Sequence, residues 1–191
     1  MDIAAIVERR AHIDDGLVIV DTFLNHRVEP PLMAQIGVQV ASLCDIRPGD
    51  IVATVEASGI APSMATATAA GVDFIYAKKT VSRPPEPIIS LPVASTTKRT
   101  TYHVGVRPAL LAGIERAWIV DDFLSDGHAA LALASIMEEC DVPVAGCAFV
   151  IEKTFRTGRR RLEEAGHSVA SLVAVDSVDE GLIVRRGADA R

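Results

Sequence analysis

Short runs of apolar, largely β-branched residues alternate with helix-like stretches along most of this chain, and this alternation constrains the fold more than any other feature. Continuous apolar strands are typical of parallel sheets that helices cover on both faces. The predicted fold class is therefore α/β, with a mostly parallel sheet flanked by helices. Ligands of such folds bind beyond the carboxyl ends of the strands. The predicted strands cover residues 51–55, 72–77, 117–120, 144–151 and 169–175.

Helix start and stop signals fit between these runs. After the first run, Pro62 opens an Ala- and Thr-rich stretch that stops at Gly71, as expected for a helix with proline in its first turn and a glycine at its end. A second helix is predicted over about residues 129–140. These signals support the strand–helix alternation.

The chain has 191 residues, enough for one domain but short for two, so we predict a single domain over residues 1–191. Residues 1–47 lack the strand–helix alternation and are expected to form a hood, while the core is expected over about 48–175. Within the hood, residues 17–20 suit an edge strand and residues 31–44 a helix. Hydrophobic residues make up 49% of the chain, which suffices for a sizeable core.

Charge, aromatic content and hydropathy exclude several classes of partner. A formal charge of −6 and an aromatic content of 4% argue against a nucleic-acid-binding module. No run approaches the ~18 apolar residues of a membrane span, so we expect a cytoplasmic protein without a membrane partner. Cys44, Cys140 and Cys147 lack metal-ligand spacing and are expected to be buried thiols.

The sequence WIVDDFLSDGHAA, residues 118–130, is the strongest candidate for a functional site. A predicted strand ends in Asp121 and Asp122, and a turn of small residues then leads into a helix. Two carboxylates can accept hydrogen bonds from vicinal sugar hydroxyls, and turn amides at a helix N-terminus can hold a phosphate. This combination suits a ribose 5-phosphate. The alternative is an ordinary surface turn in which an Asp caps the helix.

Residues 78–101 interrupt the compact pattern. The stretch contains several prolines, a run of Ser and Thr, and basic residues at both ends. A connection of this length is uncommon in a compact domain and is typical of an active-site lid or a disordered segment. Lys78 and Lys79 directly follow a predicted strand, where one could reach a phosphate or both could be solvated.

Four blocks of the sequence resemble, in order and at similar spacing, those of the type I purine phosphoribosyltransferases, and specifically the bacterial form that acts on xanthine. VDDFLSDGHAA looks like the phosphoribosyl pyrophosphate motif of that family. The resemblance covers nearly the whole chain and is weakest between about residues 80 and 117. It implies the type I phosphoribosyltransferase fold, with a hood over the base site and a mobile loop at residues 78–101. The other blocks are VDTFLNHRVEPPLMAQIG, VEASGIAPSMATATAAGVDFIYAKK and VIEKTFRTGRRRLEEAGHSVASLVAVDSVDEG.

The resemblance also implies roles for individual residues. Asp121 and Asp122 would bind the ribose hydroxyls, the turn after them the 5-phosphate, and residues 57–59, where the family often has a cis peptide, the pyrophosphate. The hood and the residue Lys153 would contact the base. The predicted contacts of phosphoribosyl pyrophosphate are Ala57, Ser58, Gly59, Lys78, Ser125, Asp126, Gly127, His128 and Ala129, and those of the base are Val18, Asn25 and Lys153.

The reaction that this resemblance implies is the transfer of phosphoribose from phosphoribosyl pyrophosphate to N9 of a 6-oxopurine, with xanthine as the expected base. Guanine, hypoxanthine or adenine are the alternative bases, and a phosphoribosyl pyrophosphate-sensing regulator without turnover is the non-enzyme alternative. Mg²⁺ is expected to arrive with the pyrophosphate, without a site made of protein side chains alone. The chain is expected to be a homodimer.

The phosphate turn departs from the usual family pattern. The family commonly has Asn-Gly-Gln or Thr-Gly, whereas this chain has Asp126-Gly127-His128. A carboxylate beside a phosphate is unfavourable unless it points to solvent or to Mg²⁺. His128 either offsets that charge or lies exposed at the start of the helix. The basic run at residues 159–161 is expected to be a solvated helix face rather than a polyanion site.

Overall fold

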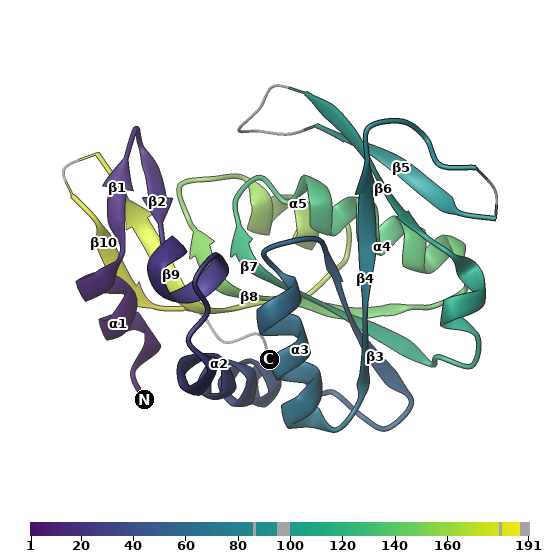
Figure 1. The fold of residues 1–191 in the computed structure, drawn as a ribbon, viewed down its shortest axis with the longest axis horizontal. Coiled ribbons are helices and arrows are strands. Elements are labelled where there is room, and N and C mark those ends of the chain that lie inside the picture. The colour runs from purple at the N-terminus through teal and green to yellow at the C-terminus, as the bar shows by residue number, and fades with distance from the viewer. Residues whose placement is uncertain (86, 95–99, 180, 188–191) are drawn as a thin grey trace.

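The computed structural model describes residues 1–85, 87–94, 100–179 and 181–187 and is built on an eight-stranded mixed sheet (Figure 1). Its strands are β3 (Asp50–Val55), β4 (Asp73–Thr80), β5 (Ile89–Ala94), β6 (Thr101–Val106), β7 (Arg116–Leu124), β8 (Val144–Lys153), β9 (Val169–Ser177) and β10 (Ile183–Arg186). The strand order is β10-β9-β8-β7-β3-β4-β6-β5. The inner strands from β9 to β4 are parallel, whereas β10, β6 and β5 pair antiparallel with their neighbours. This confirms the α/β fold class.

All of the predicted strands are present, and several extend beyond their apolar runs. β7 continues to Leu124, which pairs with Glu152, and β8 continues to Lys153, which pairs with Val175. Backbone pairing does not require apolar side chains, so the ladder continues where the sequence becomes polar. The carboxyl ends of the inner strands therefore carry polar side chains on a rigid support.

Helices cover both faces of the sheet. α1 (Ile3–Arg10), α2 (Pro30–Leu43) and α3 (Ile60–Ala70) contribute to one hydrophobic cluster, whereas α4 (His128–Glu139) and α5 (Gly158–Glu164) contribute to the other. Successive side chains of a strand point to opposite faces, so Ile51 and Ala53 join the α4 cluster and Val52 joins the α2 cluster. In the part of the chain that the structure describes, no helix is long and apolar enough to cross a membrane.

Of the first 47 residues, α1 and the hairpin that follows it lie at the β10 end of the sheet, whereas α2 lies beside α3 (Figure 1). β1 (His12–Asp14) and β2 (Leu17–Ile19) make a two-stranded antiparallel hairpin, a π-helix (Asp21–Asn25) follows, and α2 then packs on the sheet. The predicted strand at residues 17–20 therefore exists, but in its own hairpin rather than at an edge of the main sheet. Arg186 in β10 ties this part of the chain to the sheet through Asp2, at 2.9 Å.

Residues 78–101, which were expected to form an active-site lid or a disordered segment, contain regular strands. β4 runs to Thr80, β5 occupies Ile89–Ala94, and β6 begins at Thr101, so much of the stretch belongs to the sheet. Pro92 is compatible with β5 because that strand lies at the sheet edge, where every second backbone N–H points away from the neighbouring strand. Residues 86 and 95–99 lie outside the described residues. A 3₁₀-helix (Pro108–Leu111) connects β6 to β7.

The contact between α2 and α3 leads to a stability prediction at Gly37. A Cβ added to Gly37 would lie 2.4 Å from the carbonyl carbon of Ala65 in α3, so the two helices touch through the glycine. Helix propensity alone would make Gly37→Ala stabilising by about 1 kcal/mol. Because overpacking opposes it, we expect Gly37→Ala to lower the free energy of unfolding by ~1 to 3 kcal/mol in urea denaturation.

The matched control is Ser42→Ala, which lies in the same helix with an exposed side chain. It should change the free energy of unfolding by no more than ~0.5 kcal/mol. A gain in stability for Gly37→Ala would contradict the close approach of the two helices.

Candidate active site

The candidate site lies between two neighbouring parallel strands whose onward connections run to opposite sides of the sheet. β3 continues through α3 to β4 on one side, and its neighbour β7 continues through α4 to β8 on the other. Such a switch point opens a crevice at the carboxyl ends of the two strands. The loop after β3, residues 56–59, and the acidic pair at the end of β7 meet there. The peptide bond between Glu56 and Ala57 is cis.

Gly59 brings the loop directly onto the acidic pair. A Cβ added to Gly59 would lie 2.3 Å from Oδ1 of Asp121 and 2.2 Å from the hydroxyl oxygen of Thr54. Only a residue without a side chain fits between those oxygens. The loop from β3 and the carboxylate from β7 are therefore parts of one site.

Asp122 joins this site to the hood. Its side chain is only 4% exposed, and its two oxygens accept hydrogen bonds from different parts of the chain. Nδ2 of Asn25 donates to Oδ2 at 2.9 Å, and the hydroxyl of Ser58 donates to Oδ1 at 2.9 Å. The backbone N–H of Asp122 donates to Oδ1 of Asp121 at 2.8 Å. The buried carboxylate is thus satisfied by groups that fix its orientation.

Asp121 is held in a less favourable environment. Burial, reinforced by the neighbouring Asp122 carboxylate, raises the pKa of Asp121 well above its ordinary value. The nearby Lys79 ammonium opposes that rise. Burial also raises the pKa of Tyr102, and the Asp121 carboxylate adds to this shift. A carboxylate that is costly to keep ionised inside a crevice is a common mark of a functional site.

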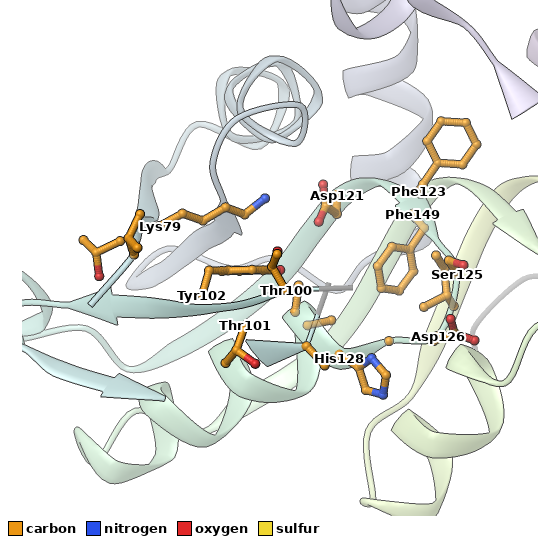
Figure 2. Close-up of a pocket in the computed structure, with 17 residues that line it drawn as sticks. Lys79, Thr100, Thr101, Tyr102, Asp121, Phe123, Ser125, Asp126, His128 and Phe149 are labelled. Atoms are coloured by element: carbon orange, nitrogen blue, oxygen red, sulfur yellow. The ribbon is translucent and has the colours of Figure 1, made fainter. Parts of the chain in front are cut away.

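A cavity of about 590 Å³ opens in front of Asp121 (Figure 2). Lys79 and Tyr102 reach into it from β4 and β6, with the Lys79 ammonium 5.2 Å from the centroid of the Tyr102 ring. Ser125 and Asp126 line the opposite side. The cavity therefore combines a cation, a phenol and a carboxylate with the turn that precedes α4.

That turn has the geometry of an anion-binding loop. Gly127 is the N-cap of α4 with a φ of +76°, and no side chain caps the helix. The first backbone N–H groups of α4 consequently have no acceptor within the helix. They lie at the positive end of the helix dipole, which is the end next to the cavity. Ser125, Asp126, Gly127, His128 and Ala129 all line the cavity, so the structure brings the predicted phosphate turn together with Asp121.

The two unusual residues of the turn are both engaged by α5. The Thr157 hydroxyl donates to Oδ1 of Asp126 at 3.3 Å, and the Arg161 guanidinium contacts Nε2 of His128. His128 is half-buried, so it is not the exposed helix-start residue of one expectation. The expectation of a solvated face at residues 159–161 is also wrong for Arg161 and for Arg159, which pairs with a buried glutamate. Arg160 alone of these arginines is exposed.

Lys79, rather than Lys78, faces the cavity. The register pairs Lys78 with Gly105 and Lys79 with Val104, so the two lysines point to opposite faces of the sheet. Both lysines are exposed, but Lys79 shares its face with buried Ala77 and lines the cavity. Lys78 does not line this cavity, and its contact with phosphoribosyl pyrophosphate stays a prediction. Strand alternation counted from Ala77 could have distinguished the two lysines.

The predicted base contacts are distributed differently from the cavity lining. Lys153 lies at the end of β8 with its ammonium 4.9 Å from the centroid of the Phe123 ring, and Phe123 lines the cavity. Burial lowers the pKa of Lys153, and Arg156 adds to this, whereas Asp122 and Asp126 oppose it. Asn25 is engaged by Asp122, and Val18 is 6% exposed within the hydrophobic cluster of the hood. Contact of these three residues with a base stays a prediction.

The cavity also contains aromatic residues that no sequence motif indicated. Tyr102, Phe123 and Phe149 come from three different strands, and only the folded sheet brings them to one cavity. Burial raises the pKa of the Cys44 and Cys147 thiols to about 12, so both stay protonated and are poor nucleophiles. Among the described residues no cluster of three His, Cys, Asp or Glu side chains could hold a metal ion.

Comparison with solved structures identifies the class of fold. The adenine phosphoribosyltransferase of Thermoanaerobacter pseudethanolicus superposes with a TM-score of 0.73 at 24% identity, covering 90% of this chain and 99% of that one. That of Trypanosoma brucei, solved with AMP, pyrophosphate and ribose-5-phosphate, has a TM-score of 0.65 at 16% identity, covering 83% and 70%. The fold is that of the type I phosphoribosyltransferases.

Sequence comparison narrows this class to one family. The xanthine phosphoribosyltransferase of Pseudomonas fluorescens is 40% identical over 172 residues, which is 90% of each chain. That of Macrococcus caseolyticus is 38% identical over 176 residues, covering 92% of this chain and 91% of the relative. No model of a protein family matches the chain. On the strength of these relatives, the chain belongs to the xanthine phosphoribosyltransferase family.

Because the two aspartates lie in different environments, we expect substitutions of Asp121 and of Asp122 to have opposite effects on the stability of the folded protein. Because the folded state holds the Asp121 proton more tightly than the unfolded state, stability falls as pH rises from the ordinary pKa of 3.8 through the raised value. Asp121→Asn should therefore raise the thermal unfolding midpoint at pH 7, and the gain should shrink as pH falls toward 3.8.

Asp122→Ala should have the opposite sign. It leaves the Asn25 amide and the Ser58 hydroxyl without their acceptor, which costs ~1 to 3 kcal/mol. Equal destabilisation by both substitutions at pH 7 would contradict the different environments of the two carboxylates.

Proposed function

We propose that this protein transfers phosphoribose from phosphoribosyl pyrophosphate to xanthine, giving xanthosine 5-monophosphate and pyrophosphate. The observation that carries the proposal is one cavity that contains the Asp121 carboxylate and the open helix N-terminus at residues 125–129, with the neighbouring Asp122 hydrogen-bonded toward the hood. Carboxylates accept from vicinal hydroxyls and amides bind a phosphate, so this arrangement fits a ribose 5-phosphate. The curated relatives at 38–40% identity carry the name xanthine phosphoribosyltransferase.

The chemistry requires positioning more than a nucleophile. The bond between ribose C1 and the pyrophosphate oxygen breaks, the electron pair leaves with the pyrophosphate, and N9 of the base bonds to C1 and loses its proton. Positive charge develops on the sugar, close to Asp121 and Asp122, while Lys79 supplies a cation within the same cavity. Water has to be kept away from ribose C1 during the transfer, because it would otherwise hydrolyse the donor.

Mg²⁺ is proposed to enter with the pyrophosphate. Mg²⁺ prefers oxygen ligands and is usually held by one or two carboxylates together with substrate phosphates. The Asp121 and Asp122 carboxylates are oxygen ligands of this kind, but both Asp122 oxygens already accept hydrogen bonds. Most ligands would therefore come from the substrate and water. The bound ion would offset the negative charge of the departing pyrophosphate.

Base choice is proposed to depend on Lys153. Its ammonium offers only donors, which suit the oxo groups of xanthine and oppose the 6-amino group of adenine. The ring of Phe123 lies under this ammonium and also lines the cavity, so a purine could reach both residues from the ribose site. Asn25 would act partly through Asp122, because its amide donates to that carboxylate. Its carbonyl oxygen is left to contact the base.

The direct test measures pyrophosphate release with xanthine, guanine, hypoxanthine and adenine at saturating phosphoribosyl pyrophosphate. We expect xanthine to be preferred over hypoxanthine by roughly tenfold or more, since an unpaired buried polar group costs ~1 to 3 kcal/mol. Preference for another base would overturn xanthine as the proposed substrate but would be consistent with the proposed transfer reaction. Binding of phosphoribosyl pyrophosphate without turnover of any base would favour the regulator alternative.

We further propose that the protein works in the cytoplasm as a homodimer of single-domain subunits. The family assignment and the lack of a spanning helix among the described residues support the first point. Light scattering at micromolar concentration tests the dimer, and a single cooperative unfolding transition tests the single domain.

Isosteric substitution of the acidic pair tests the site itself. Asp121→Asn and Asp122→Asn should each lower turnover at least ~10²-fold, because an amide replaces an acceptor-only carboxylate beside the developing charge. The control is Asp73→Asn, an exposed aspartate at the start of β4 that should retain turnover. Since Asp121→Asn is expected to be more stable than the wild type, its loss of activity would not reflect unfolding. Near-normal turnover in both variants would remove the ribose assignment.

Removal of the Lys153 ammonium tests the base site separately. Lys153→Ala should raise the KM for xanthine roughly tenfold or more and change the KM for phosphoribosyl pyrophosphate much less. Steady-state kinetics with each substrate varied in turn makes the comparison. Arg107→Ala, at an exposed position beyond β6, serves as the charge-matched control. Unchanged selectivity among the four bases in Lys153→Ala would show that another group reads the base.

A further inference from the structure

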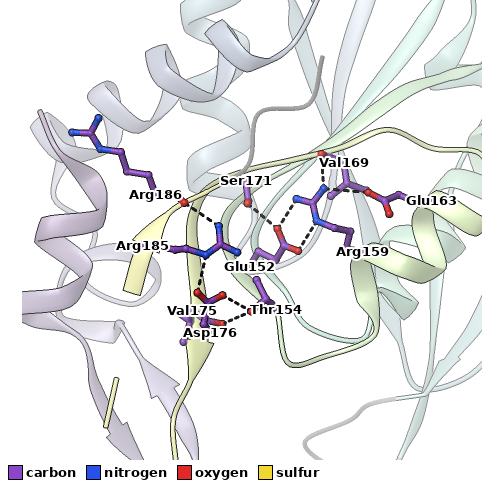
Figure 3. Close-up of polar contacts among 10 residues, drawn as sticks. All are labelled: Glu152, Thr154, Arg159, Glu163, Val169, Ser171, Val175, Asp176, Arg185 and Arg186. Atoms are coloured by element: carbon purple, nitrogen blue, oxygen red, sulfur yellow. Dashed lines mark hydrogen bonds and ion pairs between the residues drawn. The ribbon is translucent and has the colours of Figure 1, made fainter. Parts of the chain in front are cut away.

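Glu152, the residue before Lys153, is a buried carboxylate that the reaction does not use. It is 3% exposed, and its two oxygens receive a bidentate pair from Arg159 (Figure 3). Nε of Arg159 donates to Oε1 at 2.7 Å, and Nη2 donates to Oε2 at 2.6 Å. The Ser171 hydroxyl from β9 donates to Oε2 at 2.8 Å. Glu152 is therefore fully engaged at the very end of β8.

Arg159 is equally well satisfied. Its third nitrogen, Nη1, donates to the carbonyl oxygen of Val169 at 3.0 Å and to Oε1 of Glu163 at 3.2 Å. Bidentate geometry and complete hydrogen bonding are the conditions under which a buried ion pair holds two elements firmly together. The pair fixes the first turn of α5 to both β8 and β9.

The same first turn of α5 touches the phosphate turn. The backbone N–H of Gly158 donates to the carbonyl oxygen of Ser125 at 2.9 Å, and a Cβ on Gly158 would lie 2.3 Å from that oxygen. Thr157 and Arg161 contact Asp126 and His128. The beginning of α5 is therefore packed against the turn through both backbone and side chains.

Only the short segment 153–157 separates these two contacts. Lys153 begins the segment, directly after Glu152, and its carbonyl oxygen accepts from the N–H of Arg156 at 3.0 Å. Thr157 ends it. The proposed base contact and the proposed 5-phosphate contact are thus joined by one tight turn, whose two ends are held by Glu152 and Arg159.

We propose that Arg159 is a positioning residue that sets the place of Lys153 relative to the phosphate turn, and so couples the base site to the 5-phosphate site. The inference rests on the proposed function. Arg159 touches neither substrate site directly and acts through Glu152 on one side and through Thr157 and Gly158 on the other. Loss of its bidentate geometry would affect the binding of both substrates.

A second anchor supplies the comparison that the test needs. Thr154 donates to Oδ1 of Asp176 at 2.6 Å, and Nε of Arg185 donates to Oδ2 of the same carboxylate at 2.7 Å (Figure 3). This anchor holds the residue after Lys153 to β9 and β10. The described contacts of Asp176 do not include the phosphate turn, so a change at Asp176 should reach Lys153 alone.

The test compares Arg159→Lys with Asp176→Ala and Arg160→Ala in the full chain. The readouts are the KM for xanthine and the Kd of ribose 5-phosphate, the latter by calorimetry without turnover. A lysine keeps the charge of Arg159 but loses the planar fork. Arg159→Lys should raise both constants at least ~5-fold, Asp176→Ala should raise only the KM for xanthine, and Arg160→Ala, 70% exposed on the same helix, should change neither.

If Arg159→Lys does not fold, Glu152→Gln/Arg159→Gln removes both charges together and is measured in the same way. A folded variant in which kcat alone falls, or in which only one of the two constants rises, would overturn the coupling role and leave Arg159 a structural residue. Failure of the wild type to use xanthine would instead overturn the proposed function. The two failures are therefore distinguishable.

Discussion

The buried carboxylate of Asp122 connects three parts of the chain that are far apart in sequence. Asn25 comes from the hood, Ser58 from the loop after β3, and Asp122 from the end of β7. A carboxylate that is almost fully buried must be paired, and an unpaired one would be severely destabilising. The chain therefore cannot bury Asp122 without also placing the hood and the loop. Asp122 therefore links the hood to the loop after β3 at the candidate site.

The two neighbouring aspartates differ in their hydrogen bonding and in the pKa of their carboxyl groups. Both oxygens of the Asp122 carboxylate accept hydrogen bonds, which hold Asn25 and Ser58 in place. Asp121 faces the cavity, and burial raises the pKa of its carboxyl group. Such a site is less stable than its neutral counterpart, and the rest of the fold must offset the difference. The rigid parallel strands, buried on both faces, provide that support. Burial of the carboxylate therefore opposes stability at Asp121, whereas the hydrogen bonds of the carboxylate support stability at Asp122.

The sequence predicted the architecture well because apolar runs and helix signals are local. The strands around the site and the helix that ends at Gly71 were all placed correctly, and so were Asp121 and the turn 125–129 in one cavity. What sequence could not show depends on register and on distant partners. The choice between Lys78 and Lys79 required the strand faces, and the binding of Arg159 to Glu152 required the position of α5. The resemblance named a role for Asn25 but gave no sign of its bond to Asp122.

Both edges of the mixed sheet end in strands that are poor templates for another chain. β5 carries Pro92, which removes a backbone donor from one edge, and β10 carries Arg185 and Arg186 at the other. Unpaired edge strands invite edge-to-edge association, and proline and charged side chains are among the features that prevent it. Pro92 at one edge and the two arginines at the other therefore make edge-to-edge pairing with another chain less favourable.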